Sequence, residues 1–229
     1  MDDDDTNDTV SDAQPAVLPT ALRAPLGLVA ALSALLVAAL GVLYAGDGAG
    51  GAVDSWLVDP TADSVGSPWR GIGLAIDFLG EPVGSAVLVA AVVTGCLLLR
   101  WPRGAVLVVV AVAVTVGVGT ALKTVVGRTI HGPENLSYPS GHTGFLTALA
   151  LTVALLAAGR LGLGRAAGAW LVCGAALVAG AVMGWAQAAL SAHYVTDVLG
   201  GWCLALAVVP LTGWLVDRVA DARRPATPR

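Results

Sequence analysis

Long apolar segments separated by short polar stretches make up most of the chain. Six of them approach the length of about 20 residues that a helix needs to cross a bilayer. They run from Leu26 to Ala45, Pro82 to Leu99, Ala105 to Ala121, Thr143 to Ala158, Ala166 to Trp185 and Val195 to Val216. The pattern predicts an all-α polytopic membrane protein with six transmembrane helices in a bundle. Before the second span, Trp69 to Leu79 alternates polar and apolar residues, which predicts a short helix in the membrane interface.

The composition agrees with a membrane location. Of the 229 residues, 56% are hydrophobic and 12% are charged, and the mean hydropathy is +0.80. An ordinary globular domain carries about 25% charged residues. These values exclude a soluble enzyme, a disordered chain and a nucleic-acid-binding protein. The three cysteines lie far apart in apolar segments and indicate neither a disulfide framework nor a thiolate metal site.

The few charges are unevenly distributed. Six of the 16 acidic residues lie among the first twelve residues, which predicts a disordered acidic cytoplasmic tail over residues 1–24 and no secretory signal peptide. Nine of the twelve basic residues flank the predicted spans on the side of both termini: Arg23, Arg100, Arg103, Arg160, Arg165, Arg218, Arg223, Arg224 and Arg229. The other three are Arg70, Lys123 and Arg128. The positive-inside rule therefore predicts cytoplasmic termini, a membrane domain over residues 25–217, a basic cytoplasmic tail over residues 218–229, and long loops outside the cytoplasmic membrane.

The segment Pro139-Ser140-Gly141-His142-Thr143 stands at the start of the fourth predicted span. Ser140 is a good N-cap, and Gly141 lets a ligand approach the backbone. The free N–H groups of a helix start and the helix dipole favour an anion such as phosphate. His142, in the first turn, is suited to give a proton to a leaving group. The alternative is a capped helix with a solvated histidine.

His193 and Asp197 open the sixth span with i, i+4 spacing. On a helix this spacing puts both side chains on one face, where Asp197 accepts a hydrogen bond from one ring nitrogen and leaves the other as a nucleophile. The spacing is common by chance. An aspartate at the head of an apolar span is costly without such a partner, however, so the membrane setting favours the functional interpretation.

Lys123, the only lysine in the chain, closes the third span, and Arg128 follows five residues later. On the sparsely charged outer side we expect both to bind an anion, the alternative being cations that snorkel to lipid headgroups. The sequence thus predicts one site for phosphoryl transfer. No cluster of carboxylates, histidines or cysteines indicates a metal, so we expect metal-independent chemistry without a cofactor.

These motifs resemble those of the type 2 phosphatidic acid phosphatase superfamily of membrane lipid phosphatases. The family's Pro-Ser-Gly-His motif is complete at residues 139–142. Its His-x-x-x-Asp motif is present at His193 and Asp197, and its first motif keeps Lys123. The motifs cover residues 121–201, and the six-span layout extends the resemblance over most of the chain.

The resemblance implies a mechanism. His193 would attack phosphorus to form a phosphohistidine while Asp197 holds its imidazole, and His142 would protonate the leaving oxygen. The phosphate oxygens would be held by Lys123, Ser140 and the Gly141 backbone N–H.

Two motifs depart from the family pattern. The family's Arg-Pro pair is Ile130 and His131 here, and we expect Arg128, in a Gly-Arg pair that family members also show, to supply the missing charge. The family's Ser-Arg pair is Ala186-Gln187 here. We expect Gln187 to bind phosphate by hydrogen bonds, although a glutamine does not neutralise a phosphate dianion.

The sequence therefore predicts a phosphoric ester or anhydride hydrolase, a membrane lipid phosphatase acting at the outer face on a polyprenyl or phospholipid phosphate or diphosphate. Two alternatives stay open: a lipid phosphotransferase of the same fold, and a noncatalytic lipid-binding membrane protein with a degraded site. Vanadium haloperoxidases have a similar anion pocket but are soluble, which the hydropathy disfavours. The expected partners are the phosphorylated lipid and membrane lipids, not nucleic acid. The sequence leaves open which lipid is used, hydrolysis versus transfer, and the oligomeric state.

Overall fold

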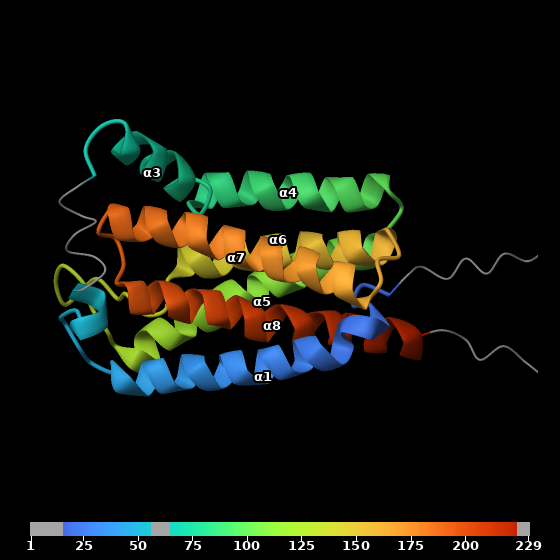
Figure 1. The fold of residues 1–229 in the computed structure, drawn as a ribbon, viewed down its shortest axis with the longest axis horizontal. Helices are drawn as coiled ribbons and strands as arrows, with labels where there is room; N and C mark the ends of the chain where they lie inside the picture. Colours follow the sequence, from blue (N-terminus) through green and yellow to red (C-terminus); the bar gives the residue numbers. More distant parts are fainter. Residues whose placement is uncertain (1–15, 56–64, 224–229) are drawn as a thin grey trace, which may run out of the picture.

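The computed structural model describes residues 16–55 and 65–223, and the elements it defines form a bundle of α-helices (Figure 1). Most of the helices run along the long axis of the molecule, and α3 is inclined to it at one end. The helices are α1 (Thr20–Leu43), α3 (Trp69–Asp77), α4 (Pro82–Leu98), α5 (Pro102–Val126), α6 (Gly141–Arg160), α7 (Arg165–Ala189) and α8 (Val195–Ala222). The all-α fold predicted from the apolar pattern is confirmed.

The lengths of these helices fit a polytopic membrane protein. Five of them are long and apolar enough to cross a membrane, and α3 with α4, bent by 61° at a short break, makes a sixth span if the pair is counted as one. The helix predicted over Trp69 to Leu79 is α3. Large apolar side chains such as Leu35, Trp170 and Leu177 remain exposed on the outer helix faces, where lipid tails would cover them.

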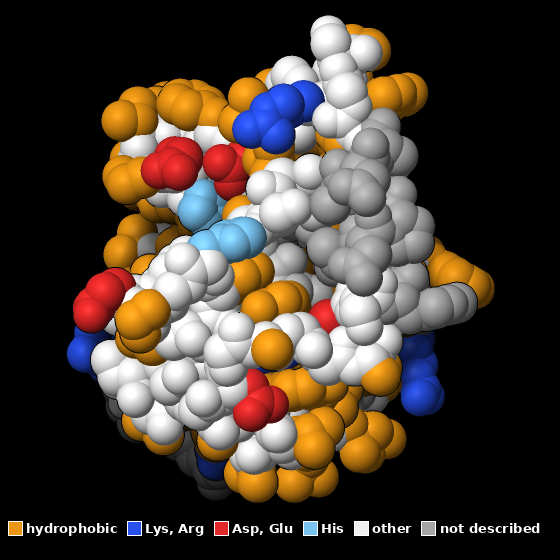
Figure 2. Space-filling model, turned by 90° about the vertical axis from the view of Figure 1, so that its left-hand side faces the viewer, with side chains coloured by type: hydrophobic (Ala, Val, Ile, Leu, Met, Phe, Trp, Pro, Cys, Tyr) orange, Lys and Arg blue, Asp and Glu red, His pale blue; other side chains and the backbone are white. Residues whose placement is uncertain are grey.

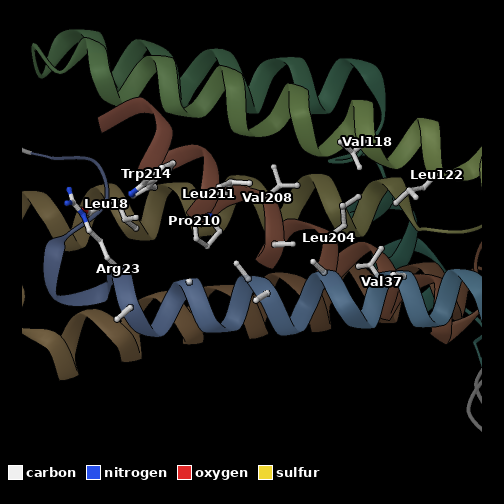
Figure 3. Close-up of a pocket in the computed structure, with 17 residues that line it drawn as sticks. Leu18, Arg23, Val37, Val118, Leu122, Leu204, Val208, Pro210, Leu211 and Trp214 are labelled. Atoms are coloured by element: carbon white, nitrogen blue, oxygen red, sulfur yellow. The ribbon is translucent and has the colours of Figure 1, made fainter. Parts of the chain in front are cut away.

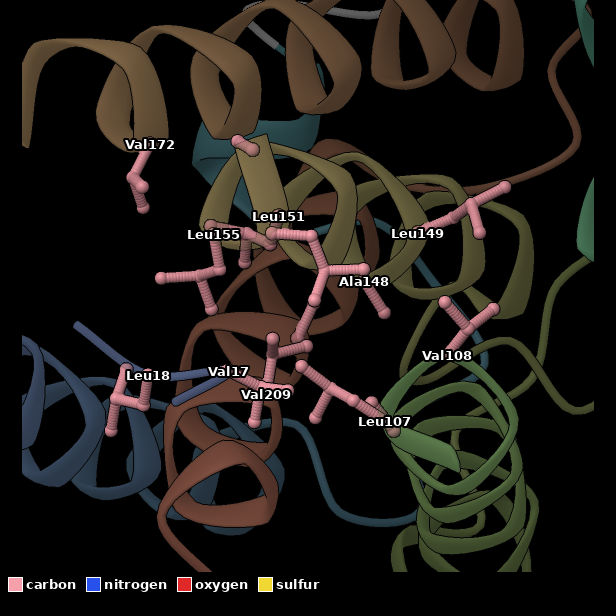
Figure 4. Packing of buried hydrophobic residues seen from close by; sticks show 14 of the residues in the cluster. Val17, Leu18, Leu107, Val108, Ala148, Leu149, Leu151, Leu155, Val172 and Val209 are labelled. Atoms are coloured by element: carbon pink, nitrogen blue, oxygen red, sulfur yellow. The ribbon is translucent and has the colours of Figure 1, made fainter. Parts of the chain in front are cut away.

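Helix α6 lies at the centre of the bundle and packs against α5, α7 and α8. Leu151 and Leu155 of α6 meet Leu107 of α5 and Val209 of α8 in the main apolar core (Figure 4). This packing fixes the direction of α6. The start of α6, which carries the Pro-Ser-Gly-His segment, is therefore held at one end of the bundle.

Residues near the N-terminus that the sequence analysis assigned to the disordered tail are packed in the core. Val17 and Leu18, inside the expected tail of residues 1–24, are buried, and their N–H groups donate to the Asp217 carboxylate at 2.9 and 3.1 Å. Asp217 is itself buried, so these bonds satisfy a charge that would otherwise be costly. Helix α1 begins at Thr20, and α8 continues to Ala222, beyond the expected boundary at 217. The acidic run of residues 1–15 lies outside the described residues.

Glycines let α8 approach the start of α6. A Cβ at Gly201 would overlap the carbonyl oxygen of Ser140, and one at Gly144 would lie 3.3 Å from the carbonyl oxygen of Gly201. The Ser140 N–H also donates to the carbonyl oxygen of Asp197 at 2.9 Å. The two motif-bearing helix starts are therefore joined by backbone contact.

Candidate active site

The first turn of α6 has the features of an anion-binding helix start. Ser140 is the N-cap, and its Oγ accepts a hydrogen bond from the Thr143 N–H at 3.4 Å. Gly141 is exposed, with open space where a Cβ would stand. The free N–H groups and the positive end of the helix dipole are therefore accessible beside His142.

His193 and Asp197 lie close together, but not as the expected hydrogen-bonded pair on one helix face, because His193 precedes the first residue of α8. Nδ1 of His193 lies 3.7 Å from Oδ2 of Asp197, which is longer than a hydrogen bond, and Nδ1 has no other partner. Oδ2 of Asp197 instead accepts the Tyr194 N–H at 3.1 Å and caps the helix.

The surroundings of His193 favour the neutral form of its imidazole. Burial lowers its pKa, the positive charge of Lys123 and the nearby His142 lower it further, and Asp197 opposes the shift. Lys123, His142 and Asp197 are thus the titratable side chains near His193. A neutral imidazole is the form that a nucleophile requires.

Arg128 is fully buried and faces two carboxylates. Its Nη1 donates to Oδ1 of Asp197 at 2.7 Å and to Oγ1 of Thr196 at 2.6 Å. Its Nη2 donates to Oδ2 of Asp54 at 2.7 Å. Since the side chain has no exposed surface, it offers none to a phosphate, and it differs in this from the role expected from the sequence.

Two tyrosine rings enclose the same guanidinium. Its central carbon lies 4.1 Å from the ring centre of Tyr44 and 4.4 Å from that of Tyr194. Such stacking is favourable for an arginine and less so for a lysine. An arginine therefore suits this position better than a lysine, and through its bond to Asp197 it supports that carboxylate.

Asp54 belongs to this network and was not predicted from the sequence. Its Oδ1 accepts the N–H and the hydroxyl of Thr196 at 3.0 and 2.8 Å, and its Oδ2 accepts the Gly51 N–H at 3.0 Å. Burial alone would raise the pKa of the Asp54 carboxyl, but the hydrogen bonds from Thr196, Arg128 and Gly51 outweigh burial and lower it. No spacing rule relates residue 54 to residue 196, so the sequence held no signal for this contact.

Lys123 stands in the last turn of α5 and points toward the loop that leads to α6. Its Nζ donates to the carbonyl oxygen of Leu136 at 2.6 Å and lies 3.5 Å from that of Ser137. An ammonium group has three donors. Two of them are directed at these carbonyl oxygens, which leaves one for a further acceptor.

Gln187 and Ile130 occupy the two positions where the resemblance expects arginines, and both are buried. Nε2 of Gln187 donates to Oδ1 of Asp77 at 2.6 Å. Gln187 is therefore engaged with a carboxylate of α3, a contact that differs from the expected one with phosphate.

The break between α3 and α4 places two carboxylates against His142. Nε2 of His142 lies 3.5 Å from Oδ1 of Asp77 and 3.7 Å from Oε1 of Glu81. One possible ligand atom from each of the three residues lies within 4.8 Å of the others. Figure 2, which faces this end of the bundle, shows acidic side chains beside a histidine. We expected no metal site from the sequence, and the structure brings together three residues that could form one, because residues 77 and 142 meet only in the folded bundle.

An apolar groove of about 930 Å³ runs along α1, α5 and α8 (Figure 3). Arg23 and Trp214 lie at one end, and Val37 and Leu122 lie at the other. Leu122 directly precedes Lys123, and the carbonyl oxygen of Val37 accepts the Tyr138 hydroxyl at 2.7 Å. The groove therefore ends beside the segments that carry the site.

The fold and this end of the bundle define a multi-pass membrane protein with two histidines, an aspartate, a lysine and a helix N-terminus gathered at one site. The chain belongs to the PAP2 superfamily, whose family model matches residues 104–220, just over half of the chain. The fold is similar to the crystal structure of the first transmembrane PAP2 type phosphatidylglycerolphosphate phosphatase from Bacillus subtilis, with a TM-score of 0.62 and 20% sequence identity over 88% of this chain and 97% of that one. None of the curated proteins compared with this chain matches it.

Proposed function

We propose that this PAP2 protein is a lipid phosphate phosphatase that acts through a phosphohistidine at the outer face of the cytoplasmic membrane. The observation that carries the proposal is His193, with a side chain only 11% exposed, standing 3.7 Å from the Asp197 carboxylate with Lys123 and His142 among its titratable neighbours. A neutral nucleophile, an acid, an orienting carboxylate and a cation are the groups that metal-independent transfer of a phosphoryl group requires.

In the first step, Nε2 of His193 attacks phosphorus and the P–O bond to the lipid alcohol breaks. The leaving oxygen takes a proton from His142. In the second step, His142 accepts a proton from water, the water oxygen attacks phosphorus, and the P–N bond breaks to free His193 and inorganic phosphate. Asp197 stabilises the positive imidazole of the intermediate, and the phosphate oxygens are held by Lys123, Ser140 and the Gly141 N–H.

The apolar groove supports a lipid as the substrate. It is lined by side chains such as Ala31, Val37 and Leu204, and one end of it is at Leu122, the residue before Lys123. A lipid tail in the groove would present its phosphate at headgroup depth beside the start of α6. Phosphatidylglycerol phosphate, the substrate named for the Bacillus subtilis protein of similar fold, is one candidate. Phosphatidic acid and polyprenyl phosphates or diphosphates are the others.

The test is phosphate release from a panel of these lipids by the purified protein in detergent. We expect release from at least one lipid, inhibition by vanadate and loss of activity in His193→Ala, while His131→Ala, in the loop, serves as the control. Full activity in His193→Ala would overturn the mechanism.

Noncatalytic lipid binding is the second candidate, favoured by the neutral Ile130 and Gln187 at the two arginine positions. Trapping a ³²P-labelled phosphoenzyme from a labelled lipid separates the two functions. A labelled protein that passes its phosphate to an added alcohol, and not to water, would identify a phosphotransferase.

A further inference from the structure

The apolar groove along α1, α5 and α8 has a charged end, which lies far from the candidate active site (Figure 3). Arg23, the only charged residue among the described residues that line the groove, stands there. It contacts Asp217, and from Asp197 to Asp217 α8 rises about 30 Å. This is the end of the bundle where α1 begins and α8 ends (Figure 1). The charge of Arg23 therefore takes no part in the reaction proposed at His193.

Arg23 is held at the groove by two bonds and keeps donors for a further acceptor. Its Nη2 donates to Oδ2 of Asp217 at 3.4 Å, and its Nε donates to the carbonyl oxygen of Leu18 at 3.4 Å. Asp217 also accepts two shorter bonds, from the N–H groups of Val17 and Leu18. A guanidinium has five N–H donors, and 38% of the Arg23 side chain is exposed. Arg23 can therefore bind an anion without leaving Asp217.

A second guanidinium stands beside the same opening. The central carbon of the exposed Arg218 lies 5.0 Å from the ring centre of Trp214, which lines the groove next to Arg23. Tryptophan rings favour the depth of lipid headgroups, and the planar fork of an arginine matches the oxygens of a phosphate. The charged end thus combines the groups that recognise an anionic lipid headgroup.

The groove behind these groups has the shape of a channel for an acyl chain. Residues three or four apart share one face of a helix, and the face of α1 that lines the groove carries only small side chains at this spacing: Ala24, Gly27, Ala31, Ala34 and Ala38. From Arg23 to Val37 α1 rises about 21 Å, whereas the hydrocarbon of one leaflet is about 15 Å thick. A chain from one leaflet therefore fits and leaves the far part of the groove for the substrate tail.

We propose that the Arg23 end of the groove binds an anionic phospholipid from the leaflet that contains the first turn of α1. The lipid phosphate binds Arg23 and Arg218, Trp214 lies beside the headgroup, and one acyl chain follows α1 past Gly27. The lipid is a bound ligand and not a substrate, because its phosphate is separated from His193 by the thickness of the membrane. Its binding is independent of the proposed phosphatase function.

The test measures lipid binding to the full-length protein in detergent by native mass spectrometry. The probes are phosphatidylglycerol, which is anionic and has no terminal phosphate to release, and phosphatidylcholine with the same acyl chains. We expect retention of phosphatidylglycerol with an affinity on the order of tenfold above that of phosphatidylcholine, since each arginine contributes to the attraction of an anionic lipid.

Gly27→Leu tests the groove without changing any charge. A Cβ at Gly27 meets open space, so a leucine there fills part of the groove. Displacement of two methylenes of the acyl chain lowers the affinity for phosphatidylglycerol about tenfold. Gly95→Leu is the matched control, because a Cβ at this position of α4 also meets open space but lies outside the groove.

The arginines are tested by the double variant Arg23→Gln/Arg218→Gln, which should bind the two probes with similar affinities. Arg23→Gln also removes a donor to the buried Asp217, so the thermal midpoint is measured as a check on folding. Arg218→Gln alone keeps that contact and should lower the preference for phosphatidylglycerol about fivefold. Arg160→Gln, in the last turn of α6 and outside the groove, is the control and should leave the preference unchanged.

The outcomes decide the proposal separately from the phosphatase. Equal affinities for the two probes, or equal phosphatidylglycerol binding in Gly27→Leu and Gly95→Leu, overturn the site. An unchanged preference in Arg23→Gln/Arg218→Gln also overturns it, as does a dimer that Gly27→Leu dissociates, since the groove then holds a second copy of the chain. Binding that persists in His193→Ala supports a site apart from the reaction, and its loss in that variant would place the lipid at the catalytic end instead. Absence of phosphate release from every lipid rejects the phosphatase and leaves this site standing.

Discussion

Arg128 and Asp197, 69 residues apart in the sequence, form a fully buried ion pair with 2.7 Å between Nη1 and Oδ1. Asp197 therefore has one oxygen on Arg128 and the other at the start of α8, facing His193. The pair holds this carboxylate in a fixed orientation. Asp54 accepts a hydrogen bond from the other terminal nitrogen of the same guanidinium.

Removal of this guanidinium should destabilise the protein strongly. Arg128→Met leaves the carboxylates of Asp54 and Asp197 buried without a cation, which costs about 3–5 kcal/mol. We expect a large fall in the thermal midpoint in detergent. Arg103→Met is the control, because its pair with Asp221 is at 3.5 Å and the aspartate is 57% exposed, so its loss costs less than about 1 kcal/mol. Equal midpoints for the two variants would contradict a structural role for Arg128.

The pH dependence of phosphate release should report the state of His193. Burial and the charge of Lys123 lower its pKa, so the imidazole stays neutral and active as the pH falls through the ordinary value of about 6.5. We therefore expect the acid limb, the fall of kcat/KM on the acid side of its pH profile, to lie below about pH 6.5.

Burial is the largest cause of this shift, and Lys123→Gln tests the smaller contribution of the lysine charge. Loss of a positive charge favours the protonated imidazole, which raises the pKa of His193 and moves the acid limb to higher pH, apart from any loss of rate. The substrate phosphate titrates in the same way with the wild-type protein and with Lys123→Gln, so it does not contribute to the difference between their pH profiles. A limb that stays in place or moves to lower pH contradicts the assignment of His193 as the titrating nucleophile.

Gly80 should be intolerant of a side chain because its backbone touches His142. In Gly80→Ala the new methyl group would overlap the imidazole, and a displacement of about 1 Å at a catalytic group lowers the rate on the order of 100-fold. We expect loss of phosphate release with little change in the thermal midpoint. Gly95→Ala in α4, where a Cβ meets no neighbouring side chain, should leave activity unchanged. High activity in Gly80→Ala would show that His142 need not stand where it does.

Narrowing the apolar groove should affect long lipids more than short ones. Ala31→Trp fills part of the groove. Because each buried methylene contributes about 0.8 kcal/mol, exclusion of two methylenes lowers kcat/KM about tenfold. A short-chain phosphate should be hydrolysed as before. Val178→Trp, on an exposed face of α7, is the control, and an equal effect of both tryptophans on the long substrate would show that the groove does not hold the tail.

The sequence was sufficient to predict where the helices lie and which residues form the motifs. Apolar length predicts spans because a helix satisfies its own backbone in the bilayer, and the Ser140 cap and the His193 to Asp197 spacing are local patterns. Arg128 shows the limit of such reasoning. Its place in a Gly-Arg pair was recognised from the sequence, but whether it faced phosphate or a carboxylate depended on Asp54, which lies 74 residues earlier.

The sequence by itself therefore determined a polytopic all-α membrane protein, the start of α6 at Ser140 and the closeness of His193 to Asp197. Only the tertiary structure decided which groups the charged and titratable side chains contact. Burial of Arg128 between two carboxylates and the meeting of Asp77 and Glu81 with His142 join segments that are distant in sequence. The physical reason is that caps and helix spacing act over a few residues, whereas the energy of a buried charge depends on whichever groups the packed helices bring within a few ångströms.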